Sequence, residues 1–204
     1  MHVHIIYTGG TIGMVDSPHG LVPGADLEGW LDSLLKGTPL ARSVSVTSLE
    51  PLIDSSNATP LSWQAIVDDL RAHAAADPQT AFVILHGTDT MAYTSAALSY
   101  ALTDLSVPVV VTGSQLPLGE LGTDAAANVT GALKAATSGR LSGVALFFGH
   151  RLLAGNRVTK SSSWAFTGFE SPNAAPLATT GAPWQWAPST RAGAGWKDAA
   201  PYAR

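Results

Sequence analysis

The stretch Ala81-Phe82-Val83-Ile84-Leu85-His86-Gly87-Thr88-Asp89-Thr90-Met91 gives the strongest indication of the fold. Residues 81–86 form a short, nearly continuous apolar run, as expected for a strand that is covered on both faces. A glycine and three polar residues follow, and an Ala- and Leu-rich segment over residues 89–102 then predicts a helix. A buried strand that leads through a polar turn into a helix is the building unit of an α/β domain.

The same alternation recurs along the chain. Further β-branched runs predict strands over residues 3–8, 43–49, 108–112 and 143–149, and apolar spacing predicts helices over residues 60–76 and 124–137. Strands that alternate with helices indicate an α/β domain with a mostly parallel sheet. Ligands of such domains bind beyond the carboxyl ends of the strands, so polar motifs in those positions are the candidates for a functional site.

Composition limits the class of protein. The chain has 204 residues, of which 46% are hydrophobic and 13% are charged, which is typical of one compact globular domain. A net charge of −4 argues against a nucleic-acid partner. The sequence shows no apolar run near the roughly 18 residues that span a bilayer and no export signal, so we expect a cytoplasmic protein without a membrane partner. The absence of cysteine excludes disulfides and cysteine-ligated metals within this sequence.

The composition changes after Leu177. Residues 178–204 contain no Leu, Ile or Val and are rich in Ala, Gly and Pro, with tryptophans at 184, 186 and 196. We therefore expect one folded domain over residues 1–177 and an irregular C-terminal tail over residues 178–204. An alternative is that the tryptophans of this tail dock on a partner subunit.

The first polar motif, Thr8-Gly9-Gly10-Thr11-Ile12-Gly13-Met14, directly follows the first predicted strand. Its glycines allow a sharp turn and a close approach of the backbone to a ligand. A simple tight turn is one alternative, and a dinucleotide-binding loop is another. The latter lacks its G-x-G-x-x-G pattern, and residues 16–20 read as a loop instead of a helix. A mobile loop beside the hydroxyl of Thr11 would suit a lid over a small site.

The second motif brings a hydroxyl and a carboxylate together at a strand-to-helix turn, in Thr88 and Asp89. The simplest interpretation is that one of them caps the helix over residues 89–102. Both roles can coexist, because backbone N–H groups at the start of a helix also bind anions or a developing oxyanion.

The third motif, Arg157-Val158-Thr159-Lys160-Ser161, follows the last predicted strand. Lys160 alone would most simply be a surface charge. If the fold places it beside Thr88 and Asp89, it could remove a proton from a hydroxyl. A weaker fourth element, Asp54-Ser55-Ser56-Asn57, reads either as a turn before a helix or as a pair of hydroxyls that hold a substrate carboxylate.

Taken together, these segments resemble the bacterial-type L-asparaginase family, in the variety closest to the cytoplasmic type I enzymes. The resemblance extends to about residue 178 and rests on five motifs in order: Tyr7-Thr8-Gly9-Gly10-Thr11-Ile12-Gly13-Met14, Asp54-Ser55-Ser56, His86-Gly87-Thr88-Asp89-Thr90-Met91, Val111-Thr112-Gly113-Ser114-Gln115-Leu116-Pro117 and Arg157-Val158-Thr159-Lys160.

The resemblance implies a doubly wound α/β fold and the hydrolysis of L-asparagine to L-aspartate and ammonia. It implies no metal or organic cofactor, and it implies assembly into a homo-oligomer. It assigns Thr11 as the first catalytic threonine and leading nucleophile, Thr88, Asp89 and Lys160 as the second threonine with its supporting pair, and Ser55 and Ser56 as substrate-binding residues. Thr88 and Asp89 would also bind substrate, with Asp89 holding its α-ammonium group. Hydrolysis of glutamine or another small amide is an alternative, as is a weakly catalytic regulatory protein that binds aspartate or asparagine.

Two departures from the family pattern stand out. Members of the family continue into a second α/β domain, whereas this chain resembles a short form with only the first domain and a tail. The family lid also carries a tyrosine that activates the first threonine, and the matching position here is Leu21. Leucine has no hydroxyl, so we expect Thr11 to be activated differently and Thr88 with Lys160 to carry more of the rate.

Overall fold

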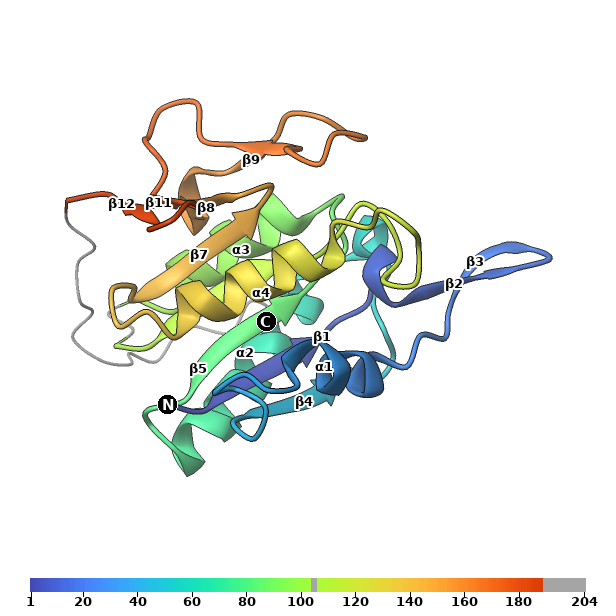
Figure 1. Ribbon diagram of the computed structural model, residues 1–204, viewed down its shortest axis with the longest axis horizontal. Helices are drawn as coiled ribbons and strands as arrows, with labels where there is room; N and C mark the ends of the chain where they lie inside the picture. Colours follow the sequence, from blue (N-terminus) through green and yellow to red (C-terminus); the bar gives the residue numbers. More distant parts are fainter. Residues whose placement is uncertain (104–105, 189–204) are drawn as a thin grey trace.

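The computed structural model describes residues 1–103 and 106–188. Its core is one large β-sheet with helices on both faces (Figure 1). The strands of this sheet are β1 (Val3–Tyr7), β4 (Val44–Ser48), β5 (Ala81–Leu85), β6 (Pro108–Thr112), β7 (Gly143–Phe148), β8 (Arg151–Ala154), β11 (Ala178–Thr179) and β12 (Gln185–Trp186). The helices are α1 (Leu27–Leu35), α2 (Pro60–Ala76), α3 (Met91–Ala101) and α4 (Ala125–Ala136).

The sheet runs in the order β12-β11-β8-β7-β6-β5-β1-β4. The strands from β4 to β7 are parallel to their neighbours, and the pairs from β7 to β12 are antiparallel. The predicted α/β class with a mostly parallel sheet is therefore confirmed. Each of the five predicted strands and three predicted helices is present, with ends that differ from the expected ones by at most two residues.

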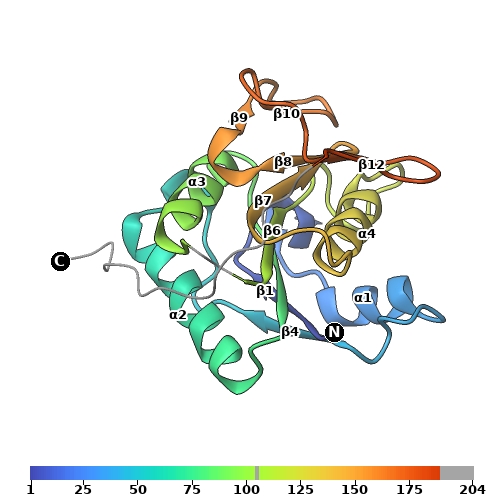
Figure 2. The ribbon, with the colours of Figure 1, turned by 90° about the vertical axis from the view of Figure 1, so that its left-hand side faces the viewer.

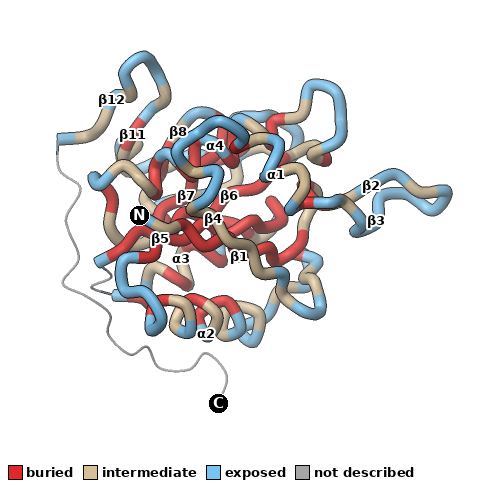
Figure 3. The backbone as a smooth tube through the Cα atoms, turned by 60° about the horizontal axis from the view of Figure 1, so that its bottom comes forward, coloured by how far each residue is buried: buried red, intermediate tan, exposed pale blue. Residues whose placement is uncertain are grey.

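Two helix layers explain why the strands are apolar on both faces. In Figure 2, α2 and α3 cover one face of the sheet and α1 and α4 cover the other. Along β5, Phe82 and Ile84 belong to the core under α2 and α3, while Val83 and Leu85 belong to the core under α1 and α4. These side chains are fully buried, and Figure 3 shows the strands as the buried centre of the molecule.

The order of the strands defines where a ligand site is expected. The chain passes from β1 to β4 on one side of β1 and then crosses to β5 on the other side. The direction of winding thus reverses between β1 and β5, which makes this pair the topological switch point of the sheet. In open α/β sheets the crevice beyond the carboxyl ends of such a strand pair binds the ligand.

The segment after the first glycine motif differs from the prediction. Residues 16–20 were expected to be loop, but Asp16, Ser17 and Gly20 lie in an antiparallel hairpin of β2 (Met14–Ser17) and β3 (Gly20–Pro23). The hairpin projects from the body of the domain and is mostly exposed (Figures 1 and 3). Strands that are exposed on both faces lack the apolar alternation by which a strand is recognised in a sequence, so the hairpin gave no such signal.

The start of the expected tail also differs from an irregular segment, because β11 and β12 extend the main sheet. The ring of Trp184 stacks on Phe147 with centroids 5.6 Å apart, and Nζ of Lys134 on α4 lies over the Trp184 ring, 5.2 Å from its centroid. Trp184 and Trp186 thus pack on this chain's own core. Trp196 lies outside the described residues. None of the helices in residues 1–103 and 106–188 combines the length and the apolar character needed to cross a membrane.

Candidate active site

Three loops meet at the switch point, each at the carboxyl end of a parallel strand. Residues 8–11 follow β1, residues 53–57 follow β4 and residues 86–90 follow β5. Glycines allow their backbones to touch: a Cβ atom on Gly10 would lie 2.5 Å from the Cα of Gly87, and one on Gly87 would overlap the side chain of Ser55. Gly10 also has a φ of 94°, which disfavours any side chain. The predicted motifs around Thr11, Ser55 and Thr88 are therefore brought into one place.

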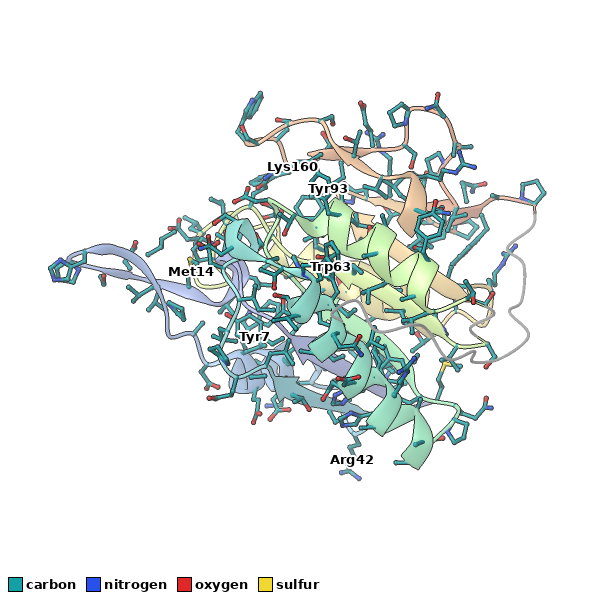
Figure 4. The ribbon with its side chains drawn as sticks, turned by 180° about the vertical axis from the view of Figure 1, so that it is seen from behind. Tyr7, Met14, Arg42, Trp63, Tyr93 and Lys160 are labelled. Atoms are coloured by element: carbon teal, nitrogen blue, oxygen red, sulfur yellow. The ribbon has the colours of Figure 1, made fainter. Side chains whose placement is uncertain are left out.

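The third motif, which contains Lys160, reaches the same place from beyond β8. Lys160 lies in the short strand β9 (Thr159–Lys160), which pairs with β10 (Phe169–Glu170). Its Nζ donates a hydrogen bond to Oγ1 of Thr88 at 3.0 Å and forms an ion pair with Oδ1 of Asp89 at 2.8 Å. In Figure 4, Lys160 lies on the same side of the molecule as Met14 and the projecting hairpin. The expected contact among Thr88, Asp89 and Lys160 is thus present.

The three side chains of this cluster are buried to different degrees. Thr88 is 8% exposed, while the side chains of Lys160 and Asp89 are 18% and 64% exposed. The hydroxyl is therefore held within the protein, the amine approaches it from a partly covered position, and the carboxylate faces solvent. A hydroxyl beside an amine that a third group orients is the arrangement of an activated nucleophile.

The simple capping interpretation of the second motif does not describe this turn. Helix α3 starts at Met91, and its N-cap is Thr90, whose side chain forms no capping hydrogen bond. The Thr90 hydroxyl instead donates to the carbonyl oxygen of Ser55 at 2.7 Å, which ties the loop after β4 to the loop after β5. Thr88 and Asp89 are left to interact with Lys160. Within the described residues, no hydrogen bond engages the backbone N–H of Thr88.

A buried chain of hydrogen bonds holds the backbone just before Thr88. His86 Nδ1 lies 2.7 Å from the carbonyl oxygen of Gly87, and its Nε2 lies 2.9 Å from the hydroxyl of Thr94. That hydroxyl accepts a hydrogen bond from the indole nitrogen of Trp63 at 3.0 Å, so it can donate its own proton to Nε2. Burial lowers the pKa of His86, and the hydrogen bond to Gly87 opposes this only in part. A neutral imidazole that donates from Nδ1 and accepts at Nε2 fits both partners.

Gln115 also contacts the cluster, and no role was predicted for it. Its Oε1 accepts a long hydrogen bond of 3.5 Å from the Thr88 hydroxyl, and its Nε2 donates to the carbonyl oxygen of Ala165 at 3.0 Å. Its backbone N–H donates to the carboxylate of Asp124 at 3.0 Å. Only its position just after a predicted strand, in the motif of residues 111–117, pointed to the site.

The two predicted substrate serines have different environments. Asp54 accepts a hydrogen bond from the backbone N–H of Ser56 at 3.0 Å and forms the turn that the sequence suggested. Ser55 is buried at 4% exposure and packs against Gly87, whereas Ser56 is exposed. Of the two hydroxyls, that of Ser55 therefore lies closer to the loop that carries Thr88.

Thr11 begins the short 3-10 turn η1 (Thr11–Gly13), which leads directly into the hairpin. Leu21 lies on β3 opposite Asp16 and is 45% exposed, so it is part of the projecting hairpin. The base of the hairpin and the loop over residues 117–121 border a cavity of about 580 Å³. The hairpin is therefore joined to the site by Thr11 but is not packed closely on the domain.

Known proteins share much of this sequence and fold. A family model described as "Asparaginase, N-terminal" matches residues 2–190. The "L-asparaginase 1" of Escherichia coli K12 is 45% identical over 88% of this chain and 53% of its own length. The crystal structure of L-asparaginase I from Vibrio cholerae superposes with a TM-score of 0.86 at 40% identity, over 98% of this chain and 61% of that one. A probable cytoplasmic L-asparaginase from Campylobacter jejuni gives a TM-score of 0.72 at 29% identity, over 87% and 55%.

Proposed function

The chain belongs to the asparaginase family, and on this premise we propose that it hydrolyses the side-chain amide of L-asparagine to L-aspartate and ammonia. The chain spans about half the length of the curated relatives it matches. The observation that carries the proposal is the contact of the Lys160 amine with both the Thr88 hydroxyl and the Asp89 carboxylate, beside the loop of Thr11. These groups supply a nucleophile, a base and a group that orients the base.

Two threonines are available to attack the amide carbon. Thr11 is the leading nucleophile by its place in the family motif, and Thr88 is the second. Lys160 acts as the base that takes the proton of the Thr88 hydroxyl over the 3.0 Å contact, while Asp89 holds the amine in place. Since Leu21 offers no hydroxyl to Thr11, the proposal gives Thr88 and Lys160 a larger part of the rate.

The substrate is held by its two charged α-groups. The exposed carboxylate of Asp89 binds the α-ammonium group in a charge-assisted contact. The α-carboxylate lies on the hydroxyls of Ser55 and Ser56 and on nearby backbone N–H groups. The N–H of Thr88 then faces the tetrahedral oxyanion, a contact typically worth about 3 kcal/mol for each donor. Neither a metal ion nor an organic cofactor takes part in this scheme.

Ammonia release from a panel of L-asparagine, D-asparagine, L-glutamine and simple amides tests the proposal. One methylene group changes discrimination by only about 1–3 kcal/mol, so the preference between asparagine and glutamine has to be measured. Turnover of L-asparagine supports the proposal. If calorimetry shows binding of aspartate or asparagine without turnover of any amide, the chain is a binding protein, an alternative that Leu21 favours.

Further proposals concern the organisation and location of the protein. Residues 1–177 contain all the proposed site residues and form the catalytic domain, and residues 178–188 complete its sheet.

We place the protein in the cytoplasm, which the description of the C. jejuni relative supports. We also expect a homo-oligomer. Light scattering tests this expectation by measuring the mass of the protein in solution.

A further inference from the structure

A second polar cluster lies on α2 and β1, near the start of β1 and away from the loop at its end. It consists of His4 on β1 and of Asp69 and His73, one helical turn apart on α2. His4 Nε2 lies 3.3 Å from Asp69 Oδ2, and His73 Nδ1 lies 3.6 Å from the same oxygen. His4 is 1% exposed and the Asp69 side chain is 15% exposed, so a carboxylate oxygen faces two ring nitrogens inside the protein.

The hydrogen bonds around this cluster are incomplete. Nδ1 of His4 and Nε2 of His2 both lie 2.8 Å from the hydroxyl of Ser45. That hydroxyl has one proton and can donate to only one of the two rings. If it donates to His2, a neutral His4 has its proton on Nδ1 and presents the lone pair of Nε2 to the Asp69 carboxylate. Among the described residues, His4 Nε2 and Asp69 Oδ2 are buried polar atoms without a hydrogen-bond partner.

We propose that His4, Asp69 and His73 bind a divalent first-row transition metal ion, with Zn²⁺ as its representative. Two imidazole nitrogens and one carboxylate oxygen are a common ligand set for such ions, and a fourth position would be left to water. Ligands about 2.0–2.1 Å from a tetrahedral metal are about 3.4 Å from one another. The separation of 3.3 Å between His4 Nε2 and Asp69 Oδ2 matches that spacing, and His73 Nδ1, now 3.6 Å from the same oxygen, lies near enough to join them.

Ser45 does not bind the metal itself but forms a hydrogen bond with one of its ligands, His4. Its hydroxyl accepts the Nδ1–H of His4 and thereby leaves the Nε2 lone pair of His4 directed at the metal. Outer partners of this kind orient a ligating histidine and tune the affinity of the site. Ser45 is free for this role when it donates its own proton to Nε2 of His2.

Binding requires one local movement. The rings of His4 and His73 are stacked, with centroids 3.5 Å apart and an interplanar angle of 17°, and two parallel rings cannot both point at one ion. The His73 side chain is 37% exposed, so its ring has room to turn out of the stack. The movement gives up the ring stack and the contact of His73 Nδ1 with the backbone carbonyl of Asp69 at 3.0 Å. The ion then ties α2 to β1 and stabilises the native domain by mass action.

Metal titration of the purified chain tests the site. After treatment with a chelator and its removal, the chain is titrated with Zn²⁺ by calorimetry and with Co²⁺ by visible absorption, and its Tm is measured with and without Zn²⁺. We expect one ion per chain, the intense visible bands of tetrahedral Co²⁺ and a rise in Tm with Zn²⁺. Asp69→Asn and His73→Gln should each weaken binding by more than about tenfold, and Ser45→Ala by about tenfold.

His19→Ala is the matched control, because His19 is an exposed histidine in the hairpin turn and its loss should leave metal binding unchanged. Asp69→Asn and His73→Gln change partly exposed side chains on the surface of α2, and circular dichroism verifies that both remain folded. Absence of binding to the unmodified chain overturns the proposal. Binding that Asp69→Asn and His73→Gln leave unchanged, or that His19→Ala abolishes, also overturns it.

Discussion

Nζ of Lys160 lies 3.0 Å from Oγ1 of Thr88, although 72 residues separate them in the sequence. The two residues follow strands that are not neighbours in the sheet. Thr88 follows β5 and Lys160 follows β8, and β6 and β7 lie between these two strands. Their contact, with Asp89 as a third member, is the arrangement from which the proposed chemistry follows. It also makes the proposal testable through single side chains.

Asp89→Asn should lower kcat/KM for L-asparagine by about 10²-fold or more, because general-base catalysis and its orientation contribute about 10²–10⁴-fold. The free energy of unfolding should change little, since an exposed ion pair contributes about 0–1 kcal/mol and the Asp89 side chain is 64% exposed. Steady-state kinetics and urea unfolding measure the two effects. A variant with normal kcat/KM would remove Asp89 from the site.

Gly10→Ala should destabilise the domain and abolish activity, because the new Cβ would lie 2.5 Å from the Cα of Gly87 and the residue has a φ of 94°. Gly20→Ala is a matched control: Gly20 has a φ of 100°, but a Cβ there meets open space. Backbone strain of about 1–3 kcal/mol is common to both. The larger loss of stability in Gly10→Ala, measured by urea unfolding, reports the contact between the two loops. Equal losses would contradict that contact.

The burial of His86 predicts a pH dependence of stability. Burial lowers its pKa in the folded state below the usual 6.5, so the unfolded chain binds the proton more readily. The contribution of His86 is therefore complete above about pH 6.5 and is lost as the pH falls from there toward the lowered pKa of the folded state.

His86→Gln removes this titrating group, while its amide can still donate and accept hydrogen bonds. We expect the variant to lose less stability than the unmodified chain between pH 7.5 and pH 5.5, as measured by urea unfolding at both values. The difference between the two proteins isolates His86 from the other histidines. Parallel losses in the two proteins would show that His86 does not contribute to the pH dependence.

Gln115→Met should lower kcat severalfold, because it removes the acceptor at 3.5 Å from the Thr88 hydroxyl and the donor to Ala165. A neutral hydrogen bond contributes about 0.5–1.5 kcal/mol, which corresponds to a change of roughly 2- to 13-fold. The backbone N–H of Gln115 still binds Asp124, so the loop should keep its shape. Full kcat in this variant would mean that Gln115 does not position the hydroxyl.

The sequence predicted those parts of the fold that are determined by buried periodicity. The bounds of α2 agree with the predicted helix over residues 60–76, and those of β6 with the predicted strand over residues 108–112. Helix α1 was not predicted, and the exposed hairpin of β2 and β3 was expected to be loop. Short strands such as β11 extend the sheet through tertiary contacts, which a local pattern does not contain.

The sequence indicated which loops form the site, but it did not indicate which side chains in them are in contact. Position after a strand singled out Thr11 and Thr88, because the carboxyl ends of parallel strands share one edge of the sheet. Only the family resemblance suggested that Lys160 would reach Thr88, since no local signal links residues on separate elements. The same limit explains why Gln115 was given no role and why the cluster of His4 and Asp69 was not foreseen.

The most direct test of the central claim compares kcat/KM for L-asparagine among the unmodified chain, Thr11→Ala, Thr88→Ala and Lys160→Met, with ammonia release as the readout. The unmodified chain should release ammonia. Thr88→Ala and Lys160→Met should each lower kcat/KM by about 10²–10⁴-fold, as expected for loss of a nucleophile or of its base. Thr11→Ala should lower it as well. Full activity of folded Lys160→Met would contradict the account.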